Sequence, residues 1–341
     1  MNNTLTALKG VKVGHSTHPE ELTGCTAILF DRAYPVGYSC YGGCPATYNT
    51  DSLRQGKMDF YRHGLFITGG SLSGLSCAPE ILKEISKKEK GFDIGDQVIP
   101  SISGAVVYDM GTFLEPYDPV CGKEAAQNAS EKPVQCGNVG AGTGTHVGKF
   151  SYAKGDLRLS MKTGAGSARI NLKSGVIVCA LSVVNAIGNV VLPNGRILAG
   201  NRDDKTNKFR VFEKETSNND QSSNTTISIV GLNVDLVTRE NYDRVAHIAS
   251  HGQVRAIKPI NTFRDGDTVF VFSTGEVKGM EANKSIKAAW PEEYGSYLNL
   301  DIISQAAADA VQESIYDACY KAKSVKFYKA FKNNVPNFKD H

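Results

Sequence analysis

At residue 225 the sequence changes abruptly from a polar segment to a stretch typical of a core strand. Residues 212–224 (FEKETSNNDQSSN) are rich in Ser and Asn and nearly free of apolar side chains. Such a segment cannot bury enough surface to order itself, so we expect a mobile loop. It runs directly into TTISIVGLNV (225–234), whose apolar and β-branched residues predict a buried strand. Any fold for this chain must place a loose tether against the first residue of a core strand.

Other apolar runs rich in Val and Ile lie between glycine-rich turns and predict further strands, at residues 25–30, 64–70, 103–110, 174–186 and 267–275. Helical patterns interleave with them at residues 78–91, 239–252 and 301–322. Thr238 is a possible N-cap, and Gly91 and Gly252 would end the first two helices. The mixture predicts a layered α/β or α+β fold, with strands in the core and helices outside.

Composition excludes several classes of protein. With 341 residues and 41% hydrophobic content, the chain can bury a large core as one large domain or two ordinary ones. A net charge of +3 favours neither a nucleic-acid nor a membrane partner, and we interpret the basic tail (323–341) as a solvated helix end and a loose terminus. There is no apolar run of membrane-spanning length and no secretory signal, so we expect a cytoplasmic protein. The eight cysteines lack zinc-ligand spacing, and we expect free thiols.

The Asn224–Thr225 junction carries the first chemical hypothesis. A Thr hydroxyl at the start of a strand, after a tether, could attack the preceding carbonyl and convert the amide into an ester that water hydrolyses. The released Thr would carry an α-amine with a pKa near about 7.7–8.0, which can accept the hydroxyl proton near neutral pH. The alternative is an ordinary loop-to-strand junction.

Four further segments contain candidate site residues, each with a structural alternative. Asp265 and Asp267 flank Gly266 and could orient a hydroxyl and an amine, or could simply form a turn. The loop GNVGAGTGTHVGK (137–149) fails both the P-loop and the dinucleotide patterns, but it delivers Lys149, which is either an oxyanion donor or a surface lysine.

Asn185 ends the apolar run VIVCALSVVN, and Tyr108 follows SGAVV; each is either a satisfied core residue or a donor that faces a site. His146, His247 and His251 are possible bases, but nothing in the sequence links them into a Ser-His-Asp set.

Taken together, these segments resemble the DmpA-type aminopeptidase family, which includes β-peptidyl aminopeptidases and a nylon-oligomer hydrolase. Seven segments carry the resemblance in the family's order: GVKVGHST (10–17), TGCTAILF (23–30), TGGSLSGL (68–75), GNVGAGTGTHVGK (137–149), VVNAIGNVV (183–191), NTTI (224–227) and FRDGDTVF (263–270). They span most of the chain, and their order is far more specific than any one of them.

The resemblance implies an αββα sandwich similar to the N-terminal nucleophile hydrolases, forming a single catalytic domain over residues 1–341. It implies self-cleavage into an α chain (1–224) and a β chain (225–341), with Thr225 as the nucleophile. Lys149, Asn185, Asp265 and Asp267 match residues of the catalytic centre of the family's nylon-oligomer hydrolase, and Tyr108 matches a tyrosine near the substrate carbonyl. It also implies peptide or amide-oligomer substrates, no metal or organic cofactor, and homo-oligomers of αβ units.

Two segments depart from the family pattern, and both are expected to shape substrate access. Where the family often has Arg-Gly-Gly, this chain has Tyr41-Gly42-Gly43, and the Gly-Gly-Ser loop continues LSGLSCA. The substrate is therefore less defined than the reaction. Aminopeptidase action and endo-hydrolysis of aminohexanoate oligomers are both compatible with the residue set. An acyltransferase of the ornithine acetyltransferase type and a non-catalytic binding relative are the alternatives from other classes.

Overall fold

The computed structural model describes residues 2–113, 117–150, 159–203, 206–212, 224–278, 292–326 and 334–335. Residues 213–223 of the expected mobile loop lie outside this description, as do 327–333 and 336–341 of the basic tail. The strands of the main sheet system are β1 (Val11–His18), β2 (Thr23–Cys40), β3 (Thr47–Tyr48), β4 (Tyr61–Thr68), β7 (Ile102–Val106), β10 (Ala165–Asn171), β11 (Ile177–Asn185), β14 (Thr225–Val234) and β16 (Thr268–Val277). All six strands predicted from apolar runs are confirmed, as β2, β4, β7, β11, β14 and β16.

Strand β2 is long enough to belong to two sheets. Its first part pairs with β1 and β4, and its last part, Val36–Cys40, pairs with β16. The pairing with β4 contains a register shift between Leu29 and Tyr34 and ends at Pro35, directly before the part that pairs with β16. One sheet therefore runs β10-β11-β14-β16-β2, and the other is built from β1, β2, β4, β7 and β3. The β14–β16 and β4–β7 pairs are parallel, and the remaining pairs of this system are antiparallel.

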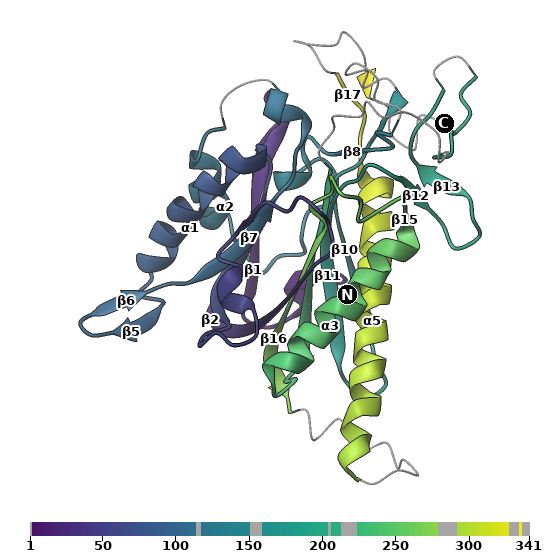
Figure 1. Ribbon diagram of the computed structural model, residues 1–341. Coiled ribbons are helices and arrows are strands. Elements are labelled where there is room, and N and C mark those ends of the chain that lie inside the picture. Colours follow the sequence, from purple (N-terminus) through teal and green to yellow (C-terminus); the bar gives the residue numbers. More distant parts are fainter. Residues whose placement is uncertain are drawn as a thin grey trace.

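Helices cover the outer face of each sheet (Figure 1). The short helices α1 (Cys77–Ser86) and α2 (Val120–Gln127) pack on the sheet that contains β1 and β4. The longer helices α3 (Arg239–Ala256) and α5 (Glu292–Lys321) pack on the sheet that contains β11 and β14. Three apolar clusters fill the three interfaces between these four layers. The expected αββα sandwich is confirmed.

The central strands are apolar on both faces because both faces are buried. In β11, Val178 and Ala180 point toward the helices α3 and α5, whereas Cys179 and Leu181 point into the space between the sheets. Alternation of side chains along the strand therefore does not appear as an alternation of polarity. This explains why these strands read as continuous apolar runs in the sequence.

Two predicted helix ends are wrong. The helix α3 does not stop at Gly252 but continues to Ala256. A Cβ at Gly252 would lie 2.2 Å from the carbonyl oxygen of Ala308, so this glycine permits close packing of α3 on α5 rather than ending the helix. The helix α1 ends at Ser86 instead of Gly91, and Glu89 in the following turn has a φ of 52°, which a continuing helix cannot accommodate.

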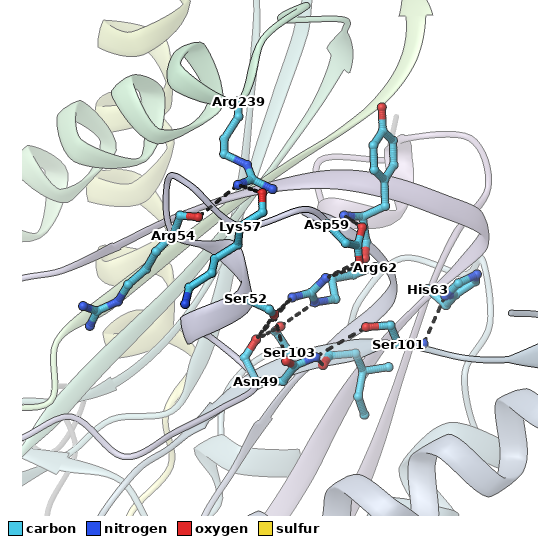
Figure 2. Close-up of polar contacts among 12 residues, drawn as sticks. Asn49, Ser52, Arg54, Lys57, Asp59, Arg62, His63, Ser101, Ser103 and Arg239 are labelled. Atoms are coloured by element: carbon cyan, nitrogen blue, oxygen red, sulfur yellow. Dashed lines mark hydrogen bonds and ion pairs between the residues drawn. The ribbon is translucent and has the colours of Figure 1, made fainter. Parts of the chain in front are cut away.

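The buried guanidinium of Arg62 anchors the segment that leads into β4 (Figure 2). It donates to Ser103 Oγ at 2.7 Å, to the Tyr61 carbonyl at 2.7 Å and to Asp59 at 3.2 Å. It also donates to the carbonyl of Asn49 and to the hydroxyl of Ser52. We call these six residues the Arg62 cluster: Asn49, Ser52, Asp59, Tyr61, Arg62 and Ser103. Each hydrogen bond helps to compensate the desolvation of one cation.

The remaining strands are short: β5 (Phe92–Ile94), β6 (Gln97–Ile99), β8 (His146–Val147), β9 (Met161–Lys162), β12 (Asn189–Val191), β13 (Ile197–Ala199), β15 (Ile257–Lys258), β17 (Val325–Lys326) and β18 (Asn334–Val335). The 3₁₀ segments are η1 (Leu5–Ala7), η2 (Asp51–Leu53), η3 (Ser71–Ser76), η4 (Met110–Phe113) and η5 (Gly140–Gly142). Within the described part of the chain, no helix combines the length and the apolar character needed to cross a bilayer.

Candidate active site

The order of three neighbouring strands brings the separately predicted residues together. Thr225 is the first residue of β14 and is only 6% exposed. It pairs in register with Asn185, the last residue of the antiparallel strand β11. On the other side, Asn224 forms a parallel bridge with Asp265, just before β16 begins. The Asn224–Thr225 peptide thus lies between the end of one strand and the start of another.

Two groups donate hydrogen bonds to the carbonyl oxygen of Asn224. The N–H of Gly266 lies at 2.8 Å, and the hydroxyl of Thr225 lies at 2.5 Å. The hydroxyl of the predicted nucleophile therefore already contacts the peptide group that it would cleave. A rotation about the Cα–Cβ bond of Thr225 is the movement that would redirect its oxygen toward the carbonyl carbon.

Two buried carboxylates lie beside this peptide. Asp267 accepts hydrogen bonds from the N–H groups of Thr226 at 2.6 Å and Asn261 at 2.9 Å, and Asp265 accepts from the N–H of Thr262 at 2.7 Å. Burial, and then the charge of Asp265, raise the pKa of Asp267 to about 7, although the two N–H groups and the charge of Lys149 oppose this shift. Two like charges held together in a buried place favour a nearby cation, such as a protonated amine.

Lys149 is a buried residue, not a surface lysine. Gly148 has a φ of 76°, and a Cβ on it would lie 2.0 Å from the backbone nitrogen of Asn201, so this position requires glycine. The N–H of Lys149 pairs with the carbonyl of Ile187 at 2.8 Å, which fixes the loop beside the end of β11. The ammonium group then donates to the carbonyl of Asn185 at 3.0 Å.

Asn185 links the glycine loop to the segment after β7. Its side-chain amide donates to the main-chain carbonyl of Tyr108 at 2.8 Å and accepts from the N–H of His146 at 3.2 Å. An amide nitrogen has two N–H groups, so one donor remains beyond the bond to Tyr108. The side chain of Tyr108 is half-buried, and burial raises the pKa of its phenol.

The three histidines do not form a catalytic set with one another. His146 is buried, with Nδ1 at 3.0 Å from the hydroxyl of Ser160. Burial, and then the charges of Lys149 and Lys162, hold its pKa well below the ordinary value, so the ring is neutral. His247 and His251 lie on the exposed side of α3, where His247 packs edge-on against Tyr41.

Gln253 is a site-supporting residue that the sequence analysis missed. Its amide donates to the carbonyl of Thr226 at 3.0 Å and to the hydroxyl of Ser228 at 3.1 Å, so it holds the start of β14 against α3. Gln253 was not predicted because the helix was expected to end at Gly252. The signal was present, since Gln253 continues the buried stripe of Tyr242, Ala246 and Ala249 at helical spacing.

A second pair of buried charges supports the glycine loop. The ammonium of Lys162 donates to the carbonyl of Gly142 at 2.9 Å, and burial lowers its pKa to about 7. Burial raises the pKa of Asp109 to about 6, while its carboxylate accepts from the hydroxyl of Thr23 at 2.7 Å. The charge of Asp109 stabilises the protonated form of Lys162. Neither residue was predicted as part of the site.

The described residues contain no group of three or more His, Cys, Asp or Glu side chains that could hold a metal ion. All eight cysteines, each of them described, are free thiols. The arrangement around Thr225 therefore offers a hydroxyl, two carboxylates, an ammonium and several amides as its chemical groups.

The sequence matches the model of peptidase family S58 over residues 3–332, which is almost the whole chain. The chain belongs to peptidase family S58. An uncharacterized aminopeptidase of Mycobacterium leprae is 29% identical over 351 aligned positions, covering 95% of this chain and 91% of the relative. A 6-aminohexanoate-oligomer endohydrolase of a Kocuria species is 27% identical, covering 79% of this chain and 74% of the relative.

A solved structure confirms the fold of this S58 member. The L-aminopeptidase D-Ala-esterase/amidase from Ochrobactrum anthropi, described as a variant of the Ntn hydrolase fold, superposes with a TM-score of 0.68. It is 20% identical, with coverage of 98% of this chain and 91% of that protein. The match to the S58 family model confirms the resemblance to the DmpA-type family that the sequence motifs indicated.

Proposed function

We propose that this chain is an amide-bond hydrolase of the N-terminal nucleophile type, activated by cleavage of its own Asn224–Thr225 bond. The observation that carries the proposal is the contact of the Thr225 hydroxyl with the Asn224 carbonyl, beside two buried carboxylates. Cleavage would give one domain of two chains, residues 1–224 and 225–341. Thr225 would then supply both the attacking oxygen and, through its new α-amine, the proton acceptor.

The neighbouring groups take roles that follow from their positions. Asp265 and Asp267 hold the α-amine and the hydroxyl of Thr225 in register, since Asp265 bridges to Asn224 and Asp267 accepts from the N–H of Thr226, on either side of Thr225. Asn185, with Lys149 or Tyr108, donates to the oxyanion of the tetrahedral intermediate formed on a substrate. Collapse of that intermediate releases the amine product and leaves an ester on Thr225, which water hydrolyses to the acid.

Peptides or linear amide oligomers are the proposed substrates. Relatives named as an aminopeptidase and as a 6-aminohexanoate-oligomer endohydrolase support this class. We further propose that the protein acts in the cytoplasm as a homo-oligomer of αβ units. Residues 41–45 lie on the turn that carries the two aspartates, because the N–H of Cys44 donates to the carbonyl of Asp265 at 2.8 Å. We therefore expect the Tyr41-Gly42-Gly43 segment, which departs from the family pattern, to affect the choice of substrate.

The assay for this proposal compares an amino-acid p-nitroanilide with a linear aminohexanoate oligomer, using the purified protein. We expect turnover of at least one of the two, with release of terminal residues indicating aminopeptidase action and internal fragments indicating endo-hydrolysis. A chain that is fully cleaved at Asn224–Thr225 but inactive on both would contradict the proposed substrate class.

A further inference from the structure

Backbone pairing between β14 and β16 continues through the bond that is proposed to break. Within the strands, Ile227 pairs with Thr268, and the bridge between Asn224 and Asp265 keeps the same offset. The Asn224–Thr225 peptide is therefore part of a parallel ladder rather than of a free loop. In such a ladder every second carbonyl of a strand accepts from an N–H of the strand on that side.

The neighbour of the Asn224 carbonyl in this ladder is the N–H of Gly266, at 2.8 Å from the carbonyl oxygen. The side-chain donors expected from the sequence make other hydrogen bonds: the amide of Asn185 donates to the Tyr108 carbonyl, and the ammonium of Lys149 donates to the Asn185 carbonyl. The main-chain N–H of Gly266 is thus already in place at the oxygen on which negative charge would develop.

We propose that the Gly266 N–H is the main-chain oxyanion donor of the self-cleavage. The inference rests on the proposed function, in which the Thr225 oxygen attacks the Asn224 carbonyl carbon and its proton passes to the departing nitrogen. The carbonyl oxygen carries the negative charge of the tetrahedral intermediate, and the Gly266 N–H stabilises it. The carbon–nitrogen bond then breaks, the nitrogen becomes the α-amine of Thr225, and water hydrolyses the ester to the Asn224 carboxylate and the Thr225 hydroxyl.

The turn that presents this N–H is held rigidly in place. The carboxylates of Asp265 and Asp267 accept the N–H groups of Thr262 and Asn261, which closes the turn from the inside. The carbonyl of Asp265 accepts the N–H of Cys44, which fixes it from the outside. A donor that is preorganised in this way needs no reorientation during the reaction, which is the condition for strong transition-state stabilisation.

Glycine is required at this position by the nucleophile itself. A Cβ on residue 266 would lie 2.8 Å from Oγ1 of Thr225 and 3.3 Å from its methyl carbon. Any side chain would therefore press on the hydroxyl that must rotate and attack. The sequence Asp-Gly-Asp thus places an N–H without a side chain between two carboxylates.

Replacing Gly266 by glycolic acid, incorporated at an amber codon during cell-free translation of the full chain, tests the role of the N–H alone. This substitution exchanges one backbone N–H for an oxygen and adds no side chain. The control places the α-hydroxy analogue of valine at Val271, in the middle of β16 and away from the scissile bond. Conversion of the pulse-labelled 341-residue chain into two chains is followed over time, and intact mass identifies the cleaved bond.

We expect the glycolate variant to cleave about 10²–10³-fold more slowly than the wild type, as for the loss of one oxyanion donor, and the Val271 variant to cleave at nearly the wild-type rate. Cleavage of the glycolate variant at the wild-type rate, or equal slowing of the glycolate and Val271 variants, would overturn the inference. A Thr225→Ala chain in the same experiment tests the proposed function separately. If that chain still splits at residue 225, the proposed function fails, whatever the glycolate variant does.

Discussion

The Arg62 cluster and the pair of carboxylates beside Thr225 are both buried, but they differ in how their charges are balanced. In the Arg62 cluster, a single cation lies among five acceptor groups and is fully enclosed. Beside Thr225, two carboxylates lie together, and burial and their mutual repulsion raise the pKa of Asp267 to about 7. A buried cation surrounded by acceptors holds a segment in place, whereas two like charges buried side by side create a site that favours a proton or a nearby cation. Burial of charge alone does not distinguish the two roles.

The strongest test of this contrast removes the nucleophile. Thr225→Ala should lower hydrolysis of an amino-acid p-nitroanilide by at least about 10⁴-fold, because no other group then forms the ester. Thr225→Ser keeps a hydroxyl at the same place and should retain measurable turnover. If the alanine variant turned over substrate at the wild-type rate, Thr225 and the two carboxylates beside it would not be the catalytic site.

The Arg62 cluster should respond in stability rather than in chemistry. Arg62→Met should lower the free energy of unfolding by about 3–5 kcal/mol, because the buried acceptors around it lose their donor. Turnover per folded molecule should stay unchanged. The control is Arg54→Met, since the exposed side chain of Arg54 forms a surface ion pair with Asp51, worth less than about 1 kcal/mol. Urea unfolding measures both, and equal losses would contradict the structural role of Arg62.

The acid pair should make stability depend on pH. Because the pKa of Asp267 is raised from 3.8 to about 7, the folded state holds a proton between these pH values that the unfolded state has lost. The free energy of unfolding should therefore fall as pH rises from about 4 to 7, with a contribution of at most about 1.4 kcal/mol per pH unit.

Asp267→Asn removes this titration, so its stability profile should be flatter than that of its parent. Both chains are compared in the uncleavable Thr225→Ala background, where no new α-amine complicates the titration. Parallel profiles over this pH range would show that the carboxylate does not have a raised pKa.

The smallest expected effect concerns Lys149. Its positive charge opposes the rise in the pKa of Asp267, so Lys149→Met should extend the pH-dependent fall in stability to higher pH. Lys83→Met on the exposed surface of α1 is the control and should leave the profile in place. An unchanged profile in the Lys149 variant, or a shift to lower pH, would contradict the action of its charge on the acid pair.

The sequence predicted the layers of the fold well because both faces of the central strands are buried, which leaves long apolar runs. Helix ends were harder to predict, because the same residue serves two purposes. Gly252 is a residue type that commonly ends helices, but here the absence of a side chain lets the backbone of α5 pack closely against α3. Because of this error Gln253 was not predicted, although its amide donates to the carbonyl of Thr226, the residue after Thr225 in β14.

Of the site, the sequence supplied the residue types but not their contacts. Lys149, Asn185, Asp265, Asp267 and Thr225 were each predicted, yet their meeting depends on the pairing of β14 with both β11 and β16. A backbone N–H carries no sequence signature, so Gly266 was interpreted as part of a turn. Asp109 and Lys162 lie far apart in the sequence and come together only in the folded chain.

N-terminal sequencing with intact-mass analysis of the purified, active protein tests the central claim most directly. The account predicts two chains, residues 1–224 and 225–341, the second beginning Thr-Thr-Ile-Ser. An active preparation that contains only the uncut chain of 341 residues would contradict it.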